Sequence, residues 1–305
     1  MRVSITYLYT IFRYGYPHRV EDTFTSLAEL HNLGLHFLEM EGLGPRHLRS
    51  LYDCRKALLR LLDDSDLHVH NFCVVDPDLV TLDITKRSRA LERFQMAAEL
   101  ADTLGCDTLH VASYPPPVRY LDGTPYQLDR KAGYRFADHP RILIPDSLDW
   151  SRVWCALVES CQCCADIAAQ HGKTLMIEPR VGEVIASVDS LLRLLEHVGR
   201  PNFRANFDTA HFCAQRENVC LALVKLRGQF ANIHVADNDP VNTAHLPIGE
   251  GIIDWNEFFR LLKLMNYDGY LGLDFGKRRS PVPAYRRSIA YMQAITSKLG
   301  ITLEV

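Results

Sequence analysis

The chain has 305 residues, a formal net charge of -3 and 47% hydrophobic residues. This length and composition predict one large core and a single domain over residues 1–305. The charges are interspersed, without the basic stripe that binds a phosphate backbone or the polybasic patch that binds lipid, so we expect neither a nucleic acid nor a membrane partner.

The N-terminal residues lack the charged, apolar and small-residue zones of a secretory signal. No apolar stretch approaches the ~18 residues of a membrane helix. Nine cysteines, an odd number, stand mostly within apolar segments, as Cys106, Cys155 and Cys220 do. This usage indicates reduced thiols in a core rather than a disulfide framework. We therefore expect a cytoplasmic protein.

Short β-rich runs alternate with amphipathic segments along the chain, which is typical of successive βα units. A first strand is predicted over residues 3–9, and a helix from Glu21 ends at Gly34. Further strands are predicted at residues 35–41, 67–75, 107–113, 174–180, 203–210, 230–236 and 270–276. Eight strands with seven intervening helices and a last helix at 283–299 predict an α/β fold, a single (β/α)8 TIM barrel.

One connection interrupts this alternation. About residues 115–149, between the fourth strand and the next helix, form an inserted segment that is too long and too rich in proline for an ordinary βα loop. It follows the carboxyl end of a strand, on the face where long loops commonly act as lids or subunit contacts. A lid, a contact of a homo-oligomer and a passive surface excursion all remain open.

Four predicted strands in the second half of the chain end in residues of the types that commonly bind metal ions. These residues are Glu178, Asp208, His234 and Asp274, at intervals of 30, 26 and 40 residues. Because the carboxyl ends of parallel strands meet at one face, the four side chains are expected to converge. Carboxylates gathered in a low-dielectric pocket repel one another, so protons or a divalent cation must neutralise them. A shared metal site is the simpler hypothesis.

Other polar residues of the predicted strands are also candidates for the face where the four ligands meet. His68 and His70 stand in the third predicted strand, and His70, which is nearer the carboxyl end, is the expected candidate. His110 stands in the fourth strand. Glu39 and Glu41 end the second strand and are interpreted as residues of the barrel rim, although one of them could point inward.

Four motifs carry a family resemblance: IEP at 177–179, FDTAH at 207–211, IHVADND at 233–239 and HLPIGEGIIDW at 245–255. With them the chain resembles the xylose-isomerase-like TIM barrel superfamily, specifically its sugar phosphate isomerase/epimerase family, whose fold is shared with endonuclease IV. The resemblance covers essentially the whole barrel, and residues 114–149 are its least typical part.

The resemblance implies a divalent metal ion held by Glu178, Asp208, His234 and Asp274. One imidazole and three carboxylates form a hard, oxygen-rich set that favours Mn²⁺, with Mg²⁺, Co²⁺ and Zn²⁺ as alternatives. The implied substrate is a small-molecule carbohydrate. The residues expected to contact it are His70, His110, His211, Arg180 and His245.

The implied activity is that of an isomerase or epimerase acting on a sugar, a sugar phosphate or an inosose. A proton next to the carbonyl is removed, and a metal-stabilised enediolate forms. Glu178 is the expected base, and Asp274 is the acid on the opposite face that would permit epimerisation.

Two departures from the family pattern keep the reaction type open. Relatives usually carry Glu where Asp274 stands, which is one methylene shorter, and Pro240 stands where ketose 3-epimerases tend to carry Arg. A one-base isomerase, or a metal-dependent lyase or dehydratase acting on a keto-sugar or keto-cyclitol, therefore fits as well.

A metal-dependent phosphodiesterase like endonuclease IV is a further alternative, because several histidines could complete a multinuclear site. Two features argue against it: Thr243 stands where the nuclease motif carries an acid, and the chain is mildly acidic where a DNA-binding face should be basic. A metal-free binding protein would be favoured only if the purified protein bound no metal.

Overall fold

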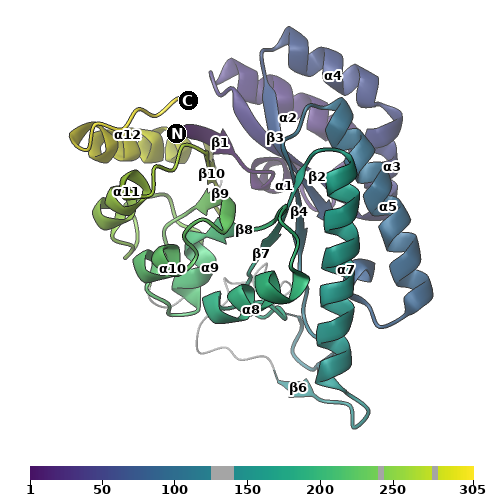
Figure 1. Cartoon of the computed structure of the whole chain (residues 1–305). Coiled ribbons are helices and arrows are strands. Elements are labelled where there is room, and N and C mark those ends of the chain that lie inside the picture. Colours follow the sequence, from purple (N-terminus) through teal and green to yellow (C-terminus); the bar gives the residue numbers. More distant parts are fainter. Residues whose placement is uncertain (125–140, 240–243, 277–280) are drawn as a thin grey trace.

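The computed structural model describes residues 1–124, 141–239, 244–276 and 281–305. These residues form a closed barrel of parallel strands, in the order β1, β10, β9, β8, β7, β4, β3, β2, with helices around it (Figure 1). The predicted fold class is therefore confirmed. The bounds of the barrel strands are β1 (Arg2–Ile5), β2 (Phe37–Leu43), β3 (His68–Val75), β4 (Thr108–Ala112), β7 (Thr174–Glu178), β8 (Phe203–Asp208), β9 (Phe230–Val235) and β10 (Tyr270–Leu273).

The helices cover the outside of the barrel (Figure 1). Two helices, where one was expected, follow each of β1, β2 and β8. Among the described residues, no helix combines the length and apolar character needed to cross a membrane. The helices are α1 (Leu8–Tyr14), α2 (Val20–Asn32), α3 (Gly44–Asp53), α4 (Arg55–Asp64), α5 (Ile84–Thr103), α7 (Trp150–Gln170), α8 (Val188–Val198), α9 (Thr209–Ala214), α10 (Val219–Lys225), α11 (Trp255–Leu264) and α12 (Pro281–Lys298), and a short 3₁₀ helix covers Pro77–Val80.

The first strand is shorter than predicted. The sequence predicts a strand over residues 3–9, but β1 ends at Ile5 and α1 begins at Leu8. Tyr9 is buried and donates its hydroxyl to Glu29 of α2 at 2.8 Å. Tertiary packing of α1 on α2 therefore overrides the β-propensity of the Thr and Tyr residues in this segment. As a result, Tyr7 lies in the turn that follows the carboxyl end of β1.

The hydrophobic core lies between the barrel and its helices. Phe207 of β8 packs against Phe212 of α9 and Phe258 of α11, with ring centroids 4.8 and 6.2 Å apart. Trp255 at the start of α11 stacks edge-on against Phe258 at 5.4 Å. These rings are fully buried, so the helices are fixed on the outer faces of the strands that carry the predicted ligands.

The interior of the barrel is polar. Glu39 of β2 accepts hydrogen bonds from Asn71 of β3 and Asn232 of β9, each at 3.0 Å. Since β1 and β10 separate β2 from β9 in the barrel, the bond to Asn232 crosses the interior. Asn232 also donates to Asn206 of β8 at 3.0 Å. Asn232 and Asn206 stand two residues before His234 and Asp208, so this network supports the candidate ligands from below.

The segment after β4 is described at its two ends. Strands β5 (Arg119–Tyr120) and β6 (Ile142–Leu143) pair in antiparallel fashion, and the Asp149 side chain caps α7 by accepting the Ser151 N–H at 2.9 Å. Residues 125–140 lie outside the described residues, and so do Pro240 and Thr243. The role of the 115–149 loop as a lid or a subunit contact stays a prediction.

All nine cysteines are free thiols. Cys161 and Cys164 are buried in α7, where burial raises the pKa of both thiols. Five of the nine are buried, as expected of core residues: Cys73, Cys106, Cys161, Cys164 and Cys213. Cys155 is exposed, so its interpretation as a core residue is wrong.

Candidate metal centre and substrate pocket

Three of the four predicted ligands meet at the carboxyl ends of their strands. Glu178 ends β7, Asp208 ends β8, and His234 stands near the end of β9. One donor atom from each lies within 4.8 Å of the others, and all three residues are at most 2% exposed. We call these three residues the ligand cluster.

One carboxylate oxygen of Asp208 caps a helix, and the other has no hydrogen-bond partner among the described residues. Its Oδ1 accepts the backbone N–H of His211 at 2.8 Å and so caps the first turn of α9. Its Oδ2 is buried and has no hydrogen-bond partner among the described residues. A buried carboxylate oxygen in this state costs free energy unless a proton or a cation satisfies it.

His234 is oriented by the acid beneath it. Its Nε2 lies 3.1 Å from both carboxylate oxygens of Glu39. Its Nδ1 lies 2.7 Å from Glu178 Oε1, but it has no aligned hydrogen bond to any described residue. If Nε2 carries the proton that Glu39 accepts, the Nδ1 lone pair is directed at the two carboxylates of the cluster. A carboxylate, a histidine and a metal ion are commonly arranged in this way.

The protein side chains alone favour a protonated His234. Burial lowers the pKa of His234, but the charges of Glu39 and Glu178 outweigh burial and raise it well above its ordinary value. A bound cation would therefore take the place of the Nδ1 proton.

Burial raises the pKa of Asp208 to about 7, with the Glu178 and Asp274 charges acting in the same direction. Burial also opposes ionisation of Glu39, but the positive charge and hydrogen bond of His234 outweigh it and lower the pKa of Glu39 to about 2. A divalent cation would relieve the repulsion among the carboxylates. The donor set therefore fits a metal ion.

Asp274, the fourth predicted ligand, lies next to the ligand cluster without joining it. Its Oδ2 is 3.1 Å from His245 Nδ1, and its backbone carbonyl oxygen is 3.0 Å from the same nitrogen. Its Oδ1 is buried without a hydrogen-bond partner among the described residues. Asp274 thus has one oxygen available at the edge of the site, and its role as ligand or second acid stays a prediction.

Arg180 stands two residues after the end of β7 and contacts the ligand cluster. Its Nε contacts Glu178 Oε2, and its Nη2 donates to the Tyr7 hydroxyl at 2.7 Å. Asn206 Nδ2 holds the other Glu178 oxygen at 2.7 Å. Burial disfavours the charged form of Glu178, but Arg180 and His234 outweigh burial and lower its pKa well below the ordinary value. Glu178 is therefore ionised, and Arg180 is its counter-charge.

His211 and His245 line the side of the site beside Asp208. One donor atom from each of the three residues lies within 4.8 Å of the others, and the two rings are 4.9 Å apart. Burial lowers the pKa of His211 to about 3, so its ring is neutral, and its Nδ1 has no hydrogen-bond partner among the described residues. This position suits the predicted substrate contact by His211, which stays a prediction.

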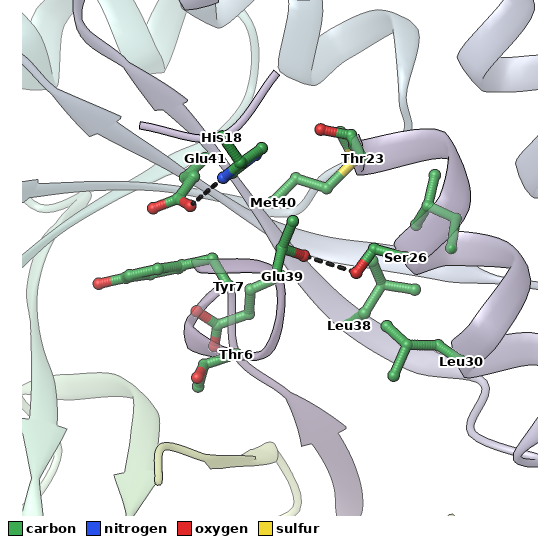
Figure 2. A pocket seen from close by; sticks show the side chains of 12 residues that line it. Thr6, Tyr7, His18, Thr23, Ser26, Leu30, Leu38, Glu39, Met40 and Glu41 are labelled. Carbon is green, nitrogen blue, oxygen red and sulfur yellow. Dashed lines mark hydrogen bonds and ion pairs between the residues drawn. The ribbon is translucent and has the colours of Figure 1, made fainter. Parts of the chain in front are cut away.

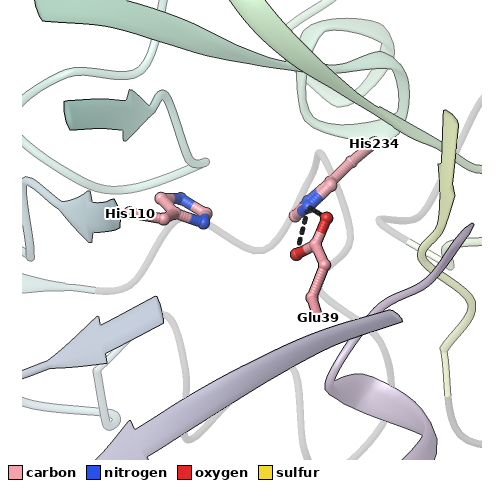
Figure 3. Close-up of side chains that lie close together, drawn as sticks. All are labelled: Glu39, His110 and His234. Atoms are coloured by element: carbon pink, nitrogen blue, oxygen red, sulfur yellow. Dashed lines mark hydrogen bonds and ion pairs between the residues drawn. The ribbon is translucent and has the colours of Figure 1, made fainter. Parts of the chain in front are cut away.

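His110 lies close to the ligand cluster, whereas His70 lies nearer the amino-terminal end of the barrel. His110 points toward the Glu39 and His234 pair (Figure 3), and its Nε2 is 3.9 Å from Glu178 Oε2. His70 also faces the interior, at 1% exposed, but it stacks on Tyr270 at the start of β10 and contacts Ser4 Oγ at 3.0 Å. Its Nε2 lies 3.6 Å from Glu39 Oε1. The substrate contact by His70 stays a prediction.

The interpretation of Glu39 and Glu41 as rim residues is wrong. They are 3% and 4% exposed, and Glu39 lies inside the barrel. The signal for this was present in FLEMEG, where two acids alternate with apolar residues on a strand that is buried on both faces. The same two-residue spacing would have found Asn206 and Asn232. Tyr7 carried no such signal, because its segment looked like a strand.

A family model described as xylose isomerase-like TIM barrel matches residues 27–295. The chain therefore belongs to the xylose isomerase-like TIM barrel family. This family assignment agrees with the resemblance seen in the sequence motifs.

The relatives include several sugar epimerases. L-ribulose-5-phosphate 3-epimerase UlaE of Salmonella paratyphi A is 23% identical over 252 residues, which cover 81% of this chain and 79% of that protein. The crystal structure of a D-tagatose 3-epimerase-like protein has a TM-score of 0.74 at 19% identity and covers 98% of this chain and 100% of the other. The sequence relative supports an enzyme of the isomerase and epimerase class with a carbohydrate substrate. At 19% identity the solved structure shows the shared fold alone.

One structural neighbour belongs to the other functional class considered. An AP endonuclease, family 2, from Brucella melitensis has a TM-score of 0.67 at 18% identity and covers 95% of this chain and 99% of that one. At this identity the likeness shows the shared fold alone.

Proposed function

We propose that this chain is a divalent-metal-dependent sugar isomerase or epimerase that moves a proton next to a carbonyl group. The observation that carries the proposal is the ligand cluster, with the Nδ1 of His234 directed at the carboxylates of Glu178 and Asp208 and its Nε2 held by Glu39. A site that gathers buried acids around one oriented imidazole is suited to a cation and to anionic reaction intermediates.

Glu178 is the base in this proposal. The side chain is ionised, lies at the carboxyl end of β7 and is held at both oxygens, by Asn206 and by Arg180. A bound divalent cation supplies the positive charge that stabilises an enediolate. Arg180 must release Glu178 Oε2 before this oxygen can take a proton, and its contact with the Tyr7 hydroxyl gives the guanidinium a second acceptor at the site.

We assign Mn²⁺ as the preferred ion, on the chemistry of the donors. His234 contributes one imidazole nitrogen, and Glu178, Asp208 and Asp274 contribute carboxylate oxygens, which suits hard divalent cations. No thiol is among these residues. Mg²⁺, Co²⁺ and Zn²⁺ are the ions to compare with it.

Asp274 decides between two reaction types. Epimerisation by two bases needs a second acid that can reach the carbon from the opposite face. The Asp274 carboxylate is short and its Oδ2 pairs with His245, which favours a single-base isomerase, or a lyase that eliminates from the same enediolate. The relatives named as epimerases favour epimerisation.

The test is hydrogen exchange in D₂O. Metal-loaded protein is incubated with ketoses, ketose phosphates, inososes and keto-glycosides, and deuterium is located by NMR and mass spectrometry. We expect deuterium at one carbon next to the carbonyl of one substrate class. A shifted carbonyl indicates an isomerase, an inverted carbon an epimerase and loss of water a lyase. The proposal fails if the loaded protein exchanges no carbon-bound hydrogen in any of these compounds.

A further inference from the structure

Glu41 is a buried acid without a hydrogen-bond partner. It stands at the carboxyl end of β2 and is 4% exposed, and neither carboxylate oxygen accepts a hydrogen bond from any described residue. Glu39, two residues earlier on the same face, is fully bonded by contrast. A polar side chain that is buried without a partner destabilises a protein, so such a group at a functional face calls for a ligand.

Two buried histidines near Glu41 each have a ring nitrogen without a hydrogen-bond partner among the described residues. His18 Nδ1 is 3.7 Å from Glu41 Oε1 and has no hydrogen-bond partner in the described part of the chain. His47 packs edge-on against His18 at 4.7 Å, accepts the Leu43 N–H through Nδ1 at 3.0 Å and leaves Nε2 without a partner there. Burial lowers the pKa of His18 and lowers that of His47 to about 4, so both rings are neutral.

The space beside these side chains is small. Tyr7, His18, Glu39 and Glu41 line one part of a cavity of about 20 Å³, and Met40 and residues of α2 such as Leu30 line most of the rest, so the cavity extends between β2 and α2. It has room for about one water molecule or one hydroxyl group. Figure 2 shows the Glu41 carboxyl group and the Tyr7 hydroxyl group directed to the same side. Tyr7 is also the partner of Arg180, so the cavity adjoins the site that holds Glu178.

We propose that Glu41 and His18 form a hydroxyl-binding subsite of the sugar pocket, which takes an uncharged hydroxyl group of the substrate. This inference rests on the proposed function and deepens it, because it names the kind of group that the substrate carries on the β2 side. The substrate hydroxyl group donates a hydrogen bond to one of these two side chains and accepts one from the other. Neither Glu41 nor His18 Nδ1 has such a hydrogen bond to the described residues.

The chemistry of the subsite selects hydroxyl over phosphate. Burial, with the Asp274 charge, raises the pKa of Glu41 well above its ordinary value, while Arg180 acts in the opposite direction. A neutral carboxyl group offers one donor, and an ionised one repels phosphate. The neutral imidazole of His18 adds no positive charge. In either state of Glu41 the subsite therefore disfavours a phosphate group and accepts a hydroxyl group.

The first measurement is the stability of the ligand-free, metal-loaded protein. Glu41→Met replaces the carboxyl group by an apolar side chain of similar length, and Glu41→Gln keeps a polar group. Met40→Leu, at the neighbouring position of the strand, changes an apolar side chain that lines the same cavity and is the matched control. We expect both Glu41 variants to unfold at or above the temperature of the parent, because a buried group without partners is removed or neutralised. A midpoint several degrees lower in both, with Met40→Leu unchanged, would show that Glu41 has a structural role and overturn the subsite.

The second measurement is sugar binding. The probes are unphosphorylated ketohexoses, their monodeoxy derivatives and their phosphate esters, and binding is followed by the shift in the unfolding midpoint, which needs no turnover. We expect the Kd for the best ketohexose to rise at least tenfold in Glu41→Met and to stay unchanged in Met40→Leu. One monodeoxy ketose, lacking the hydroxyl group that the subsite holds, should bind the parent and Glu41→Met equally.

The outcomes separate the two proposals. If the parent exchanges deuterium and Glu41→Met binds the ketose as tightly as the parent does, the subsite is overturned and the proposed function stands. No exchange, with ketose binding that still depends on Glu41, overturns the function and supports the subsite. A parent that binds none of the sugars overturns the subsite as well.

Discussion

Glu39 illustrates at the residue scale how a side chain without substrate contact can govern the site. Its carboxylate holds the Nε2 of His234 and so directs Nδ1 toward Glu178 and Asp208. Partners of this kind typically change metal affinity by about 10- to 100-fold. We expect Glu39→Gln to weaken metal binding by that factor, as measured by competition with a chelator. Glu41→Gln, two residues along the strand, is the control and should bind metal as the parent does. Equal affinities in all three proteins would remove Glu39 from the metal site.

Glu178 and Asp274 have separate expected roles that conservative substitutions can distinguish. Glu178→Gln keeps the size and one coordinating oxygen but removes the base, so deuterium exchange should fall by about 10² to 10⁴ while metal remains bound. Asp274→Glu should retain the metal and bring a longer acid toward the substrate carbon. Undiminished exchange in Glu178→Gln would contradict the assignment of the base.

At the scale of elements, Glu183 joins the loop after β7 to the end of β4. Its Oε2 accepts the N–H groups of Ser113 and Tyr114 and the Ser113 hydroxyl, at 2.9, 2.7 and 2.9 Å. Burial raises the pKa of Glu183 from 4.5 to about 8, although these hydrogen bonds oppose it. A raised pKa in the folded state stabilises the fold below pH 4.5, and this contribution is lost as the pH rises through about 8.

Glu183→Gln keeps an acceptor for the two N–H groups and does not titrate. We therefore expect its free energy of unfolding, measured by urea denaturation, to fall less steeply than that of the parent between pH 4.5 and 8. Glu183→Ala should be less stable at every pH, by about 1–3 kcal/mol for each donor left without a partner. The exposed Glu92→Gln is the control. A parallel pH dependence in Glu183→Gln and the parent would show that Glu183 does not titrate in this window.

The sequence predicted the elements that carry period-two or helical patterns and missed those decided by packing. The eight barrel strands lie within a few residues of their predicted positions, and four of them carry the predicted ligands Glu178, Asp208, His234 and Asp274. The exception is residues 3–9, where contacts of Tyr9 with α2 produce a helix. Distances between strands far apart in the chain, such as the 3.1 Å between Glu39 and His234, follow from barrel closure and have no local signature.

Metal binding should stabilise the whole molecule, because the proposed ligands lie at the ends of four neighbouring strands of a closed barrel, β7, β8, β9 and β10. A ligand that binds only the folded state adds about 2.7 kcal/mol at 100 times its Kd. We expect removal of the metal by a chelator to lower the unfolding midpoint by several degrees, and addition of Mn²⁺ to restore it. His234→Ala should unfold at the same temperature with and without chelator. A similar response of His234→Ala and the parent would place the stabilising ion elsewhere.

The central claim is that Glu178, Asp208 and His234 hold one divalent ion, and the metal content of purified variants tests it most directly. The proteins compared are the parent, Asp208→Ala, His234→Ala and the control His68→Ala, whose imidazole is 43% exposed and stacks on Tyr270 at the start of β10. Each is loaded with Mn²⁺, freed of excess metal and measured by elemental analysis. Circular dichroism establishes that each variant is folded. The account predicts about one ion per chain in the parent and in His68→Ala, and almost none in the other two. Folded Asp208→Ala and His234→Ala proteins that keep as much metal as the parent would contradict it.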